Sequence, residues 1–93
     1  MYKFEVWRGW IEYPFGGGMA RRMETREVIA ANVREALKKS GIDEIDEYDL
    51  TDVDYRRMNW AFKKPDTRER DEEGMLSGME AESWIEVTLL GAA

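Results

Sequence analysis

The chain has 93 residues, 43% of them hydrophobic, and a formal net charge of -6 at pH 7. This length supports one small hydrophobic core, and the apolar content is too high for a disordered segment. Cysteine and histidine are both absent, which excludes disulfides, thiolate nucleophiles, the commonest general base and the commonest zinc ligands.

This composition predicts a single-domain, non-enzymatic protein of the cytoplasm, with no cofactor and no bound metal. Met1 leads directly into a strand-like pattern, with no apolar targeting region before it. No apolar run approaches the ~18 residues of a membrane span. The negative charge disfavours direct binding to nucleic acid or to anionic membranes, because both attractions need an excess of Lys and Arg. A protein partner with a basic surface is therefore expected.

Residues 2–13 alternate apolar and polar side chains as a β-strand does, but the phase changes midway. Phe4 and Val6 share one face, whereas the apolar positions beyond Arg8 and Gly9 fall out of step. A β-bulge at Arg8-Gly9 restores the inward phase, since glycine tolerates the backbone angles of a bulge. With that bulge, the outward-facing side chains of the strand include Glu5, Trp7, Trp10 and Glu12.

A glycine-rich loop over 14–24 and a helix over 25–40 are predicted next. The helix is indicated by apolar residues at helical spacing, namely Ile29, Ala30, Val33, Ala36 and Leu37. Thr25 is a suitable N-cap, and Gly41 followed by Ile42 is typical of a Schellman stop.

An acidic segment covers residues 43–54, where seven of twelve positions are Asp or Glu and none is basic. The apolar residues of this segment change phase at Thr51-Asp52. That change fits either one bulged strand or a short strand that a tight turn joins to the next.

Two further strands follow, separated by a long charged loop over 64–82. Residues 55–63 alternate around Trp60 as a half-buried strand does, and residues 83–90 carry the cleanest apolar stripe in the chain. The order is therefore β-α-β-β, an α+β fold in which one helix packs on one face of a three-stranded, mainly antiparallel sheet. The last strand is expected at the centre and the other two at the edges.

An exposed aromatic face follows from this arrangement, because a single helix covers only one side of the sheet. Trp7, Trp10 and Trp84 are predicted on the uncovered side, with Glu5, Glu12 and Glu86 around them. Monomers seldom leave such a patch in water. Either loop residues Met75, Leu76 and Met79 fold over it, or it is an interface with a partner or with a second copy of the chain.

The acidic segment has three interpretations. Its carboxylates are Asp43, Glu44, Asp46, Glu47, Asp49, Asp52 and Asp54. They form a solvated stretch, or they imitate a nucleic-acid backbone and occupy a basic protein surface. Calcium binding is the third interpretation, but the spacing lacks the turn glycine and distal Glu of an EF-hand.

Two weaker patterns concern anions. Gly16, Gly17 and Gly18, followed by Arg21 and Arg22, superficially resemble a phosphate-holding loop between a strand and a helix. The pattern matches no established phosphate-binding motif. The basic pairs around Trp60 are a second pattern, which would suit single-stranded nucleic acid, but the strand alternation directs Trp60 to the core.

The sequence thus favours a non-enzymatic protein-binding module, an acidic inhibitor or regulator that occupies a basic, nucleic-acid-binding surface of its partner. Small acidic proteins without cysteine are often of this kind, including those carried by phages and mobile elements. One alternative is a structural subunit that forms homo-oligomers through the Trp-bearing face. Another is a phosphate- or nucleotide-binding domain that uses the glycine loop. No spacing of carboxylates singles out a catalytic acid and base.

Overall fold

Five antiparallel strands form one sheet in the computed structural model, which describes residues 1–12, 18–42, 45–64 and 80–93. The elements in chain order are β1 (Tyr2–Glu12), β2 (Ala20–Ala30), α1 (Val33–Lys39), the 3-10 turn η1 (Ile45–Glu47), β3 (Asp49–Asp54), β4 (Asn59–Lys64) and β5 (Glu80–Ala92). The spatial order is β2-β1-β5-β4-β3. The α+β class is confirmed, but the prediction of three strands is wrong.

The region predicted as a helix over 25–40 divides into a strand and a shorter helix. Residues up to Ala30 pair with β1 over its whole length, so ladder hydrogen bonds and burial of Ala30 replace the first turns of the expected helix. Asn32, rather than Thr25, caps α1: its side chain accepts a hydrogen bond from the Glu35 N–H at 2.9 Å. Helical spacing from Val33 onward is real, whereas its extension back to Thr25 is coincidental.

The C-terminal end of α1 is as predicted. Gly41 has a φ of +80° and donates to the Lys38 carbonyl, and Ile42 donates to the Leu37 carbonyl. This pair of bonds is the Schellman motif, and the positive φ explains why glycine stands there.

The last strand lies at the centre, as expected, because β5 pairs with both β1 and β4. The edges are β2 and β3, which the sequence placed in the helix and the acidic segment. Of the two alternatives for the phase change at Thr51-Asp52, the bulged strand is confirmed and a tight turn at that point is wrong; the strand predicted over 55–63 begins at Asn59. β3 contains a bulge at Thr51, and a turn with Met58 at a φ of +49° then leads into β4.

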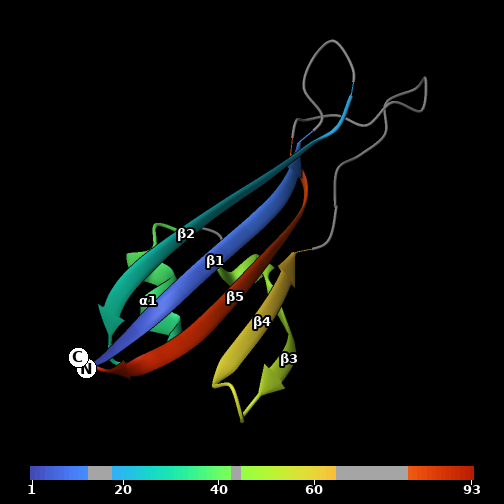
Figure 1. The fold of residues 1–93 in the computed structure, drawn as a ribbon. Coiled ribbons are helices and arrows are strands. Elements are labelled where there is room, and N and C mark those ends of the chain that lie inside the picture. Colours follow the sequence, from blue (N-terminus) through green and yellow to red (C-terminus); the bar gives the residue numbers. More distant parts are fainter. Residues whose placement is uncertain (13–17, 43–44, 65–79) are drawn as a thin grey trace.

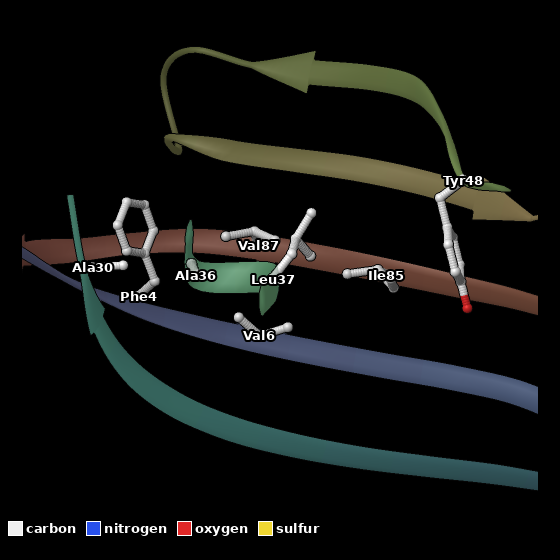
Figure 2. Packing of buried hydrophobic residues seen from close by; sticks show 8 residues of the cluster. All are labelled: Phe4, Val6, Ala30, Ala36, Leu37, Tyr48, Ile85 and Val87. Carbon is white, nitrogen blue, oxygen red and sulfur yellow. The ribbon is translucent and has the colours of Figure 1, made fainter. Parts of the chain in front are cut away.

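The core lies between α1 and one face of the sheet. Figure 1 shows α1 packed behind β2, β1 and β5, near the end of the sheet where the two chain termini meet. Figure 2 shows Leu37 of α1 against Val6, Ile85 and Val87, while Phe4 lies near Ala30 and Ala36. The long strands extend past the helix, so this short helix shields only part of one face.

Tyr48 closes one end of this core with a buried polar contact (Figure 2). Its hydroxyl lies 2.6 Å from the Ser83 Oγ. We expect Tyr48→Phe to lower the free energy of unfolding by about 1–2 kcal/mol, because the buried Ser83 hydroxyl loses its hydrogen-bond partner. Urea unfolding measures this, with Tyr55→Phe as the matched control, since Tyr55 is 77% exposed. A double-mutant cycle with Ser83→Ala that gives no coupling energy would contradict the assignment.

Candidate functional site

The face of the sheet opposite α1 is the candidate site. Phe4 and Val6 of β1 are buried on the α1 side, so strand alternation directs Lys3, Glu5 and Trp7 to the opposite side. Cross-strand partners share a face, which extends this assignment across all five strands. Among the described residues, no helix or strand covers this side, which we call the open face.

Three rows of residues cross the open face from β2 to β3. The first row is Met23, Gly9, Trp84, Lys63 and Asp49. The second row is Thr25, Trp7, Glu86, Ala61 and Asp52. The third row is Glu27, Glu5, Thr88, Asn59 and Asp54. A hydrogen bond of 2.9 Å from Asn59 Nδ2 to Thr88 Oγ1 is consistent with the third row.

The centre of the open face is aromatic. The Trp7 ring lies across Gly9: a Cβ atom at Gly9 would stand 2.6 Å from Cη2 of that ring. Trp84 is the β5 neighbour of Gly9, and Met23 is its β2 neighbour. Met23 is 70% exposed. Glycine therefore provides the space in which the large ring lies flat on the sheet, as in aromatic rescue of a strand glycine.

A groove of about 420 Å³ lies at this aromatic centre. Its lining residues are Trp7, Trp10, Arg21, Arg22, Met23 and Trp84. Apolar rings and a thioether contribute most of this lining, together with two guanidinium groups. Such a lining suits a side chain of a partner protein that has an apolar stem and a polar end.

Carboxylates border the aromatic centre on the β3 side. Asp49, Asp52 and Asp54 lie opposite Lys63, Ala61 and Asn59 of β4, whose side chains belong to the open face. Glu86 adds a further carboxylate between Trp7 and β4. The structure thus brings together part of the predicted aromatic set and part of the predicted acidic set, which were separate in the sequence.

Asp46, Glu47 and Asp54 of the acidic segment have partners within the chain. Asp46 pairs with Arg34 of α1 at 3.4 Å, and Glu47 pairs with Lys64 at 2.9 Å. Asp54 accepts hydrogen bonds from the backbone N–H groups of the turn after β3, at 3.0 and 3.2 Å. Asp43 and Glu44 lie outside the described residues. Part of the acidic run therefore serves the fold rather than a partner.

The predicted bulge at Arg8-Gly9 is wrong, because β1 pairs with β2 without any shift of register. The lack of a side chain at Gly9 leaves room for the Trp7 ring instead. The two register shifts between β1 and β5 are caused by extra residues in β5. Without the bulge, Trp10 and Glu12 share their side of β1 with Arg8, whose guanidinium lies 4.6 Å from the Trp10 ring centroid. Strand alternation thus places Trp10 on the other side of β1, although Trp10 lines the same groove as Trp7 and Trp84.

On that other face, Trp10 and Arg22 hold Glu12. Trp10 Nε1 donates to Glu12 Oε1 at 2.8 Å, and Arg22 Nε lies 3.2 Å from Oε2. The Trp10 hydrogen bond, followed by the Arg22 bond and charge, lowers the pKa of Glu12 below its ordinary value of 4.5. A lowered carboxyl pKa stabilises the fold above the unfolded-state pKa, and this contribution is lost as the pH falls through the folded-state pKa.

We therefore expect the Glu12 carboxyl to titrate below 4.5 in the folded protein. Trp10→Phe removes the N–H donor and should move the midpoint upward, and Arg22→Gln should move it upward as well. Carbon-detected NMR of the side-chain carboxyl measures both. An unchanged midpoint in Trp10→Phe would contradict the assigned cause.

The predicted anion site loses its physical basis. It required a helix after the glycines, but Arg21 and Arg22 lie in β2, where both line the groove at Trp7 and Trp84. Gly18 precedes that strand with a φ of +88°. Gly16 and Gly17 lie outside the described residues, as do Met75, Leu76 and Met79.

A second hollow, of about 430 Å³, lies on the α1 side between the helix and the β3–β4 hairpin. Leu37, Trp60 and Phe62 line it together with the Arg34–Asp46 ion pair. Trp60 and Phe62 pack against the core, in agreement with the structural role predicted for Trp60. The hollow forms because α1 is too short to cover this part of the sheet.

Sequence reasoning missed Met23, Lys63 and the relation of Trp7 to Gly9. Met23 was hidden by the loop predicted over 14–24, and Thr25 by the helix predicted over 25–40. A usable signal was present in Trp7-Arg8-Gly9, because a Trp two residues from a Gly in a strand can lie over it.

Comparison with known protein families, curated proteins and solved structures finds no match to this chain. No helix within the described part of the chain is long and apolar enough to cross a membrane. Within the same part, no three Asp, Glu, His or Cys side chains gather in a way that could hold a metal ion. The open face must therefore be interpreted from its own chemistry.

Proposed function

We propose that this protein is a binding module that docks its open face on a basic surface of a partner protein. The observation that carries the proposal is the groove at Trp7 and Trp84, which lies on an open face whose β3 border is lined by carboxylates. Partners of this kind include proteins whose basic surface otherwise binds nucleic acid.

The aromatic centre supplies binding free energy. Trp side chains are among the commonest hot spots of protein interfaces, and a large ring is desolvated at little cost in side-chain entropy. Gly9 leaves space for the Trp7 ring to lie flat on the strand. The Trp7 side chain is therefore partly ordered before a partner binds. Met23, which is flexible and 70% exposed, adapts to the shape of the partner.

The carboxylate border supplies specificity. Asp49, Asp52 and Glu86 would meet Lys or Arg side chains of the partner and accelerate association. The same carboxylates distinguish this face from sheets that stack nucleic-acid bases on exposed aromatic rings, since they would repel phosphates. The chemistry of the face therefore favours a basic protein over a nucleic acid.

The test is capture of partners on immobilised protein, with quantitative mass spectrometry of wild type, Trp84→Ala and Tyr55→Ala. Tyr55 is 77% exposed and lies in the turn after β3, so its variant is the matched control for loss of an exposed aromatic. We expect at least one basic protein that Tyr55→Ala retains and Trp84→Ala loses by about tenfold or more. Its capture should also decline with salt.

A second pair of variants tests the charge. Asp49→Asn with Asp52→Asn should weaken capture of the same protein, whereas Asp46→Asn should leave it unchanged, because Asp46 pairs with Arg34 instead. The proposal is overturned if every captured protein binds Trp84→Ala as well as wild type, or if the proteins that depend on Trp84 are acidic.

A further inference from the structure

The outer edge of β2 is a separate surface from the open face. β2 is the first strand of the sheet order, and no described strand pairs with its outer side. Eight of its eleven residues, Ala20–Ala30, are exposed. Such an edge presents backbone N–H and C=O groups to another strand unless it is protected.

The hydrogen-bonding phase of this edge can be derived from β1. Ala93 donates to the Met1 carbonyl on the β5 side of β1, so odd-numbered β1 residues bond toward β5 and even-numbered ones toward β2. The register pairs even-numbered residues of β1 with even-numbered residues of β2. Odd-numbered β2 residues therefore direct their N–H and C=O groups outward. In agreement, Lys39 Nζ reaches the Ile29 carbonyl at 2.7 Å.

A second β2 strand can pair with this edge in only a few registers. Antiparallel bonding needs outward-facing residues opposite each other, so a two-fold axis must pass through a residue rather than between two. An axis at Thr25 lies at the midpoint of Ala20–Ala30. Pairs next to the axis are then Glu24 with Arg26 of the second copy, and the reverse.

The charges favour the Thr25 axis over an axis one residue to either side. An axis one residue earlier places Glu24 opposite Glu24 and Arg22 opposite Arg26, and one residue later places Arg26 opposite itself. Both are penalised, because like charges directly opposite destabilise a sheet. At Thr25 no like charges face each other, and the two threonines form a favourable cross-strand pair.

We infer that the protein forms a two-fold homodimer by antiparallel pairing of β2 with β2 of a second copy, with the axis at Thr25. Glu24 and Arg26 then form two ion pairs at non-hydrogen-bonded positions, where side chains approach closest. The same charges protect the edge from other strands, which gives the pairing its specificity. The two sheets join into one, and their open faces stay free.

Contacts between β2 and the end of α1 limit the length of this ladder. Arg26 Nη1 also donates to the Ser40 carbonyl at 3.3 Å, which orients the guanidinium on that side of β2. Lys39 occupies the Ile29 carbonyl, so the continuous ladder runs over the central pairs, Thr25 with Thr25 and Met23 with Glu27.

Sedimentation equilibrium over a concentration series tests the dimer. We expect wild type to form a dimer and both Glu24→Arg and Arg26→Glu to dimerise at least about tenfold more weakly, because each replaces two ion pairs with like-charge pairs. A mixture of the two variants should recover dimers, since one chain then carries two arginines at these positions and the other carries two glutamates. Glu24→Arg combined with Arg26→Glu in one chain should recover them as well.

Two further variants separate this dimer from association through another surface. Thr25→Pro removes an outward N–H that the monomer does not use, so it should abolish the dimer while circular dichroism shows the fold intact. Trp84→Ala should leave the dimer unchanged, which keeps this result independent of the proposed function. The inference is overturned if wild type is a monomer at all concentrations, if the mixture fails to recover dimers, or if Trp84→Ala rather than Thr25→Pro dissociates them.

Discussion

Ile85→Ala is expected to lower the free energy of unfolding by about 3–4 kcal/mol. Ile85 is fully buried in the central strand β5, where it contributes to the packing of Leu37 on the sheet. The cavity it leaves lies between α1 and the sheet, so neighbouring side chains cannot close it without moving the ladder. Thermal and urea unfolding measure the loss.

Leu90→Ala is the matched control in the same strand. Leu90 is 47% exposed at the bulge near the end of β5, so its truncation should change the free energy of unfolding by no more than about 0.5 kcal/mol. Equal losses for the two variants would mean that the core is not where Figure 2 places it.

Gly9→Ala is expected to weaken partner binding by about tenfold while changing stability little. A new Cβ would stand 2.6 Å from Cη2 of Trp7, so the ring must leave the strand surface. Because that ring is the end of a half-exposed side chain, it can move without unfolding the sheet, and replacing a strand glycine offsets part of the cost. Near-UV circular dichroism should change and far-UV should not.

A double-mutant cycle isolates the cause. If Gly9 acts by positioning Trp7, Gly9→Ala should add nothing to the binding defect of Trp7→Ala, because the two changes are then strongly non-additive. Independent defects that simply add would contradict the proposed relation between the glycine and the ring.

The parts of the fold that could be predicted from sequence are those that local chemistry determines. The apolar stripe of β5 and the Schellman stop at Gly41 were recognised because a single strand or a single helix end specifies them. Helical spacing from Val33 onward marked α1 correctly. Asn32 and Glu35, at capping-box spacing, mark its true beginning, a signal that the expected N-cap at Thr25 obscured.

The rest depended on pairing between distant strands. Residues from Ala20 to Ala30 are too charged to alternate cleanly, and they form a strand because β1 supplies a partner along their length. The local sequence around Gly9 is compatible with a bulge or with a regular strand. The strand is regular, and the space above Gly9 is filled by the Trp7 ring. Trp7 and Trp84 share a face as the alternation of each strand predicts. Without the predicted bulge, Trp10 lies on the other side of β1, although it lines the same groove.

The acidic segment shows the same limit of prediction from sequence. Its charge was plain in the sequence, but the division between Asp46, which pairs with α1, and Asp49 and Asp52, which border the open face, follows from register with β4. No composition argument separates these carboxylates, because only strand pairing determines which of them share a face with Trp7.

Oxidative footprinting of the tryptophans in a complex with a captured partner tests the central claim most directly, since the chain carries its own control. Trp7 and Trp84 lie on the open face, whereas Trp60 packs against the core on the α1 side. We predict that partner binding protects Trp7 and Trp84 from oxidation and leaves Trp60 as reactive as in the free protein. Protection of Trp60 with Trp7 and Trp84 unchanged would contradict the assignment of the open face as the binding surface.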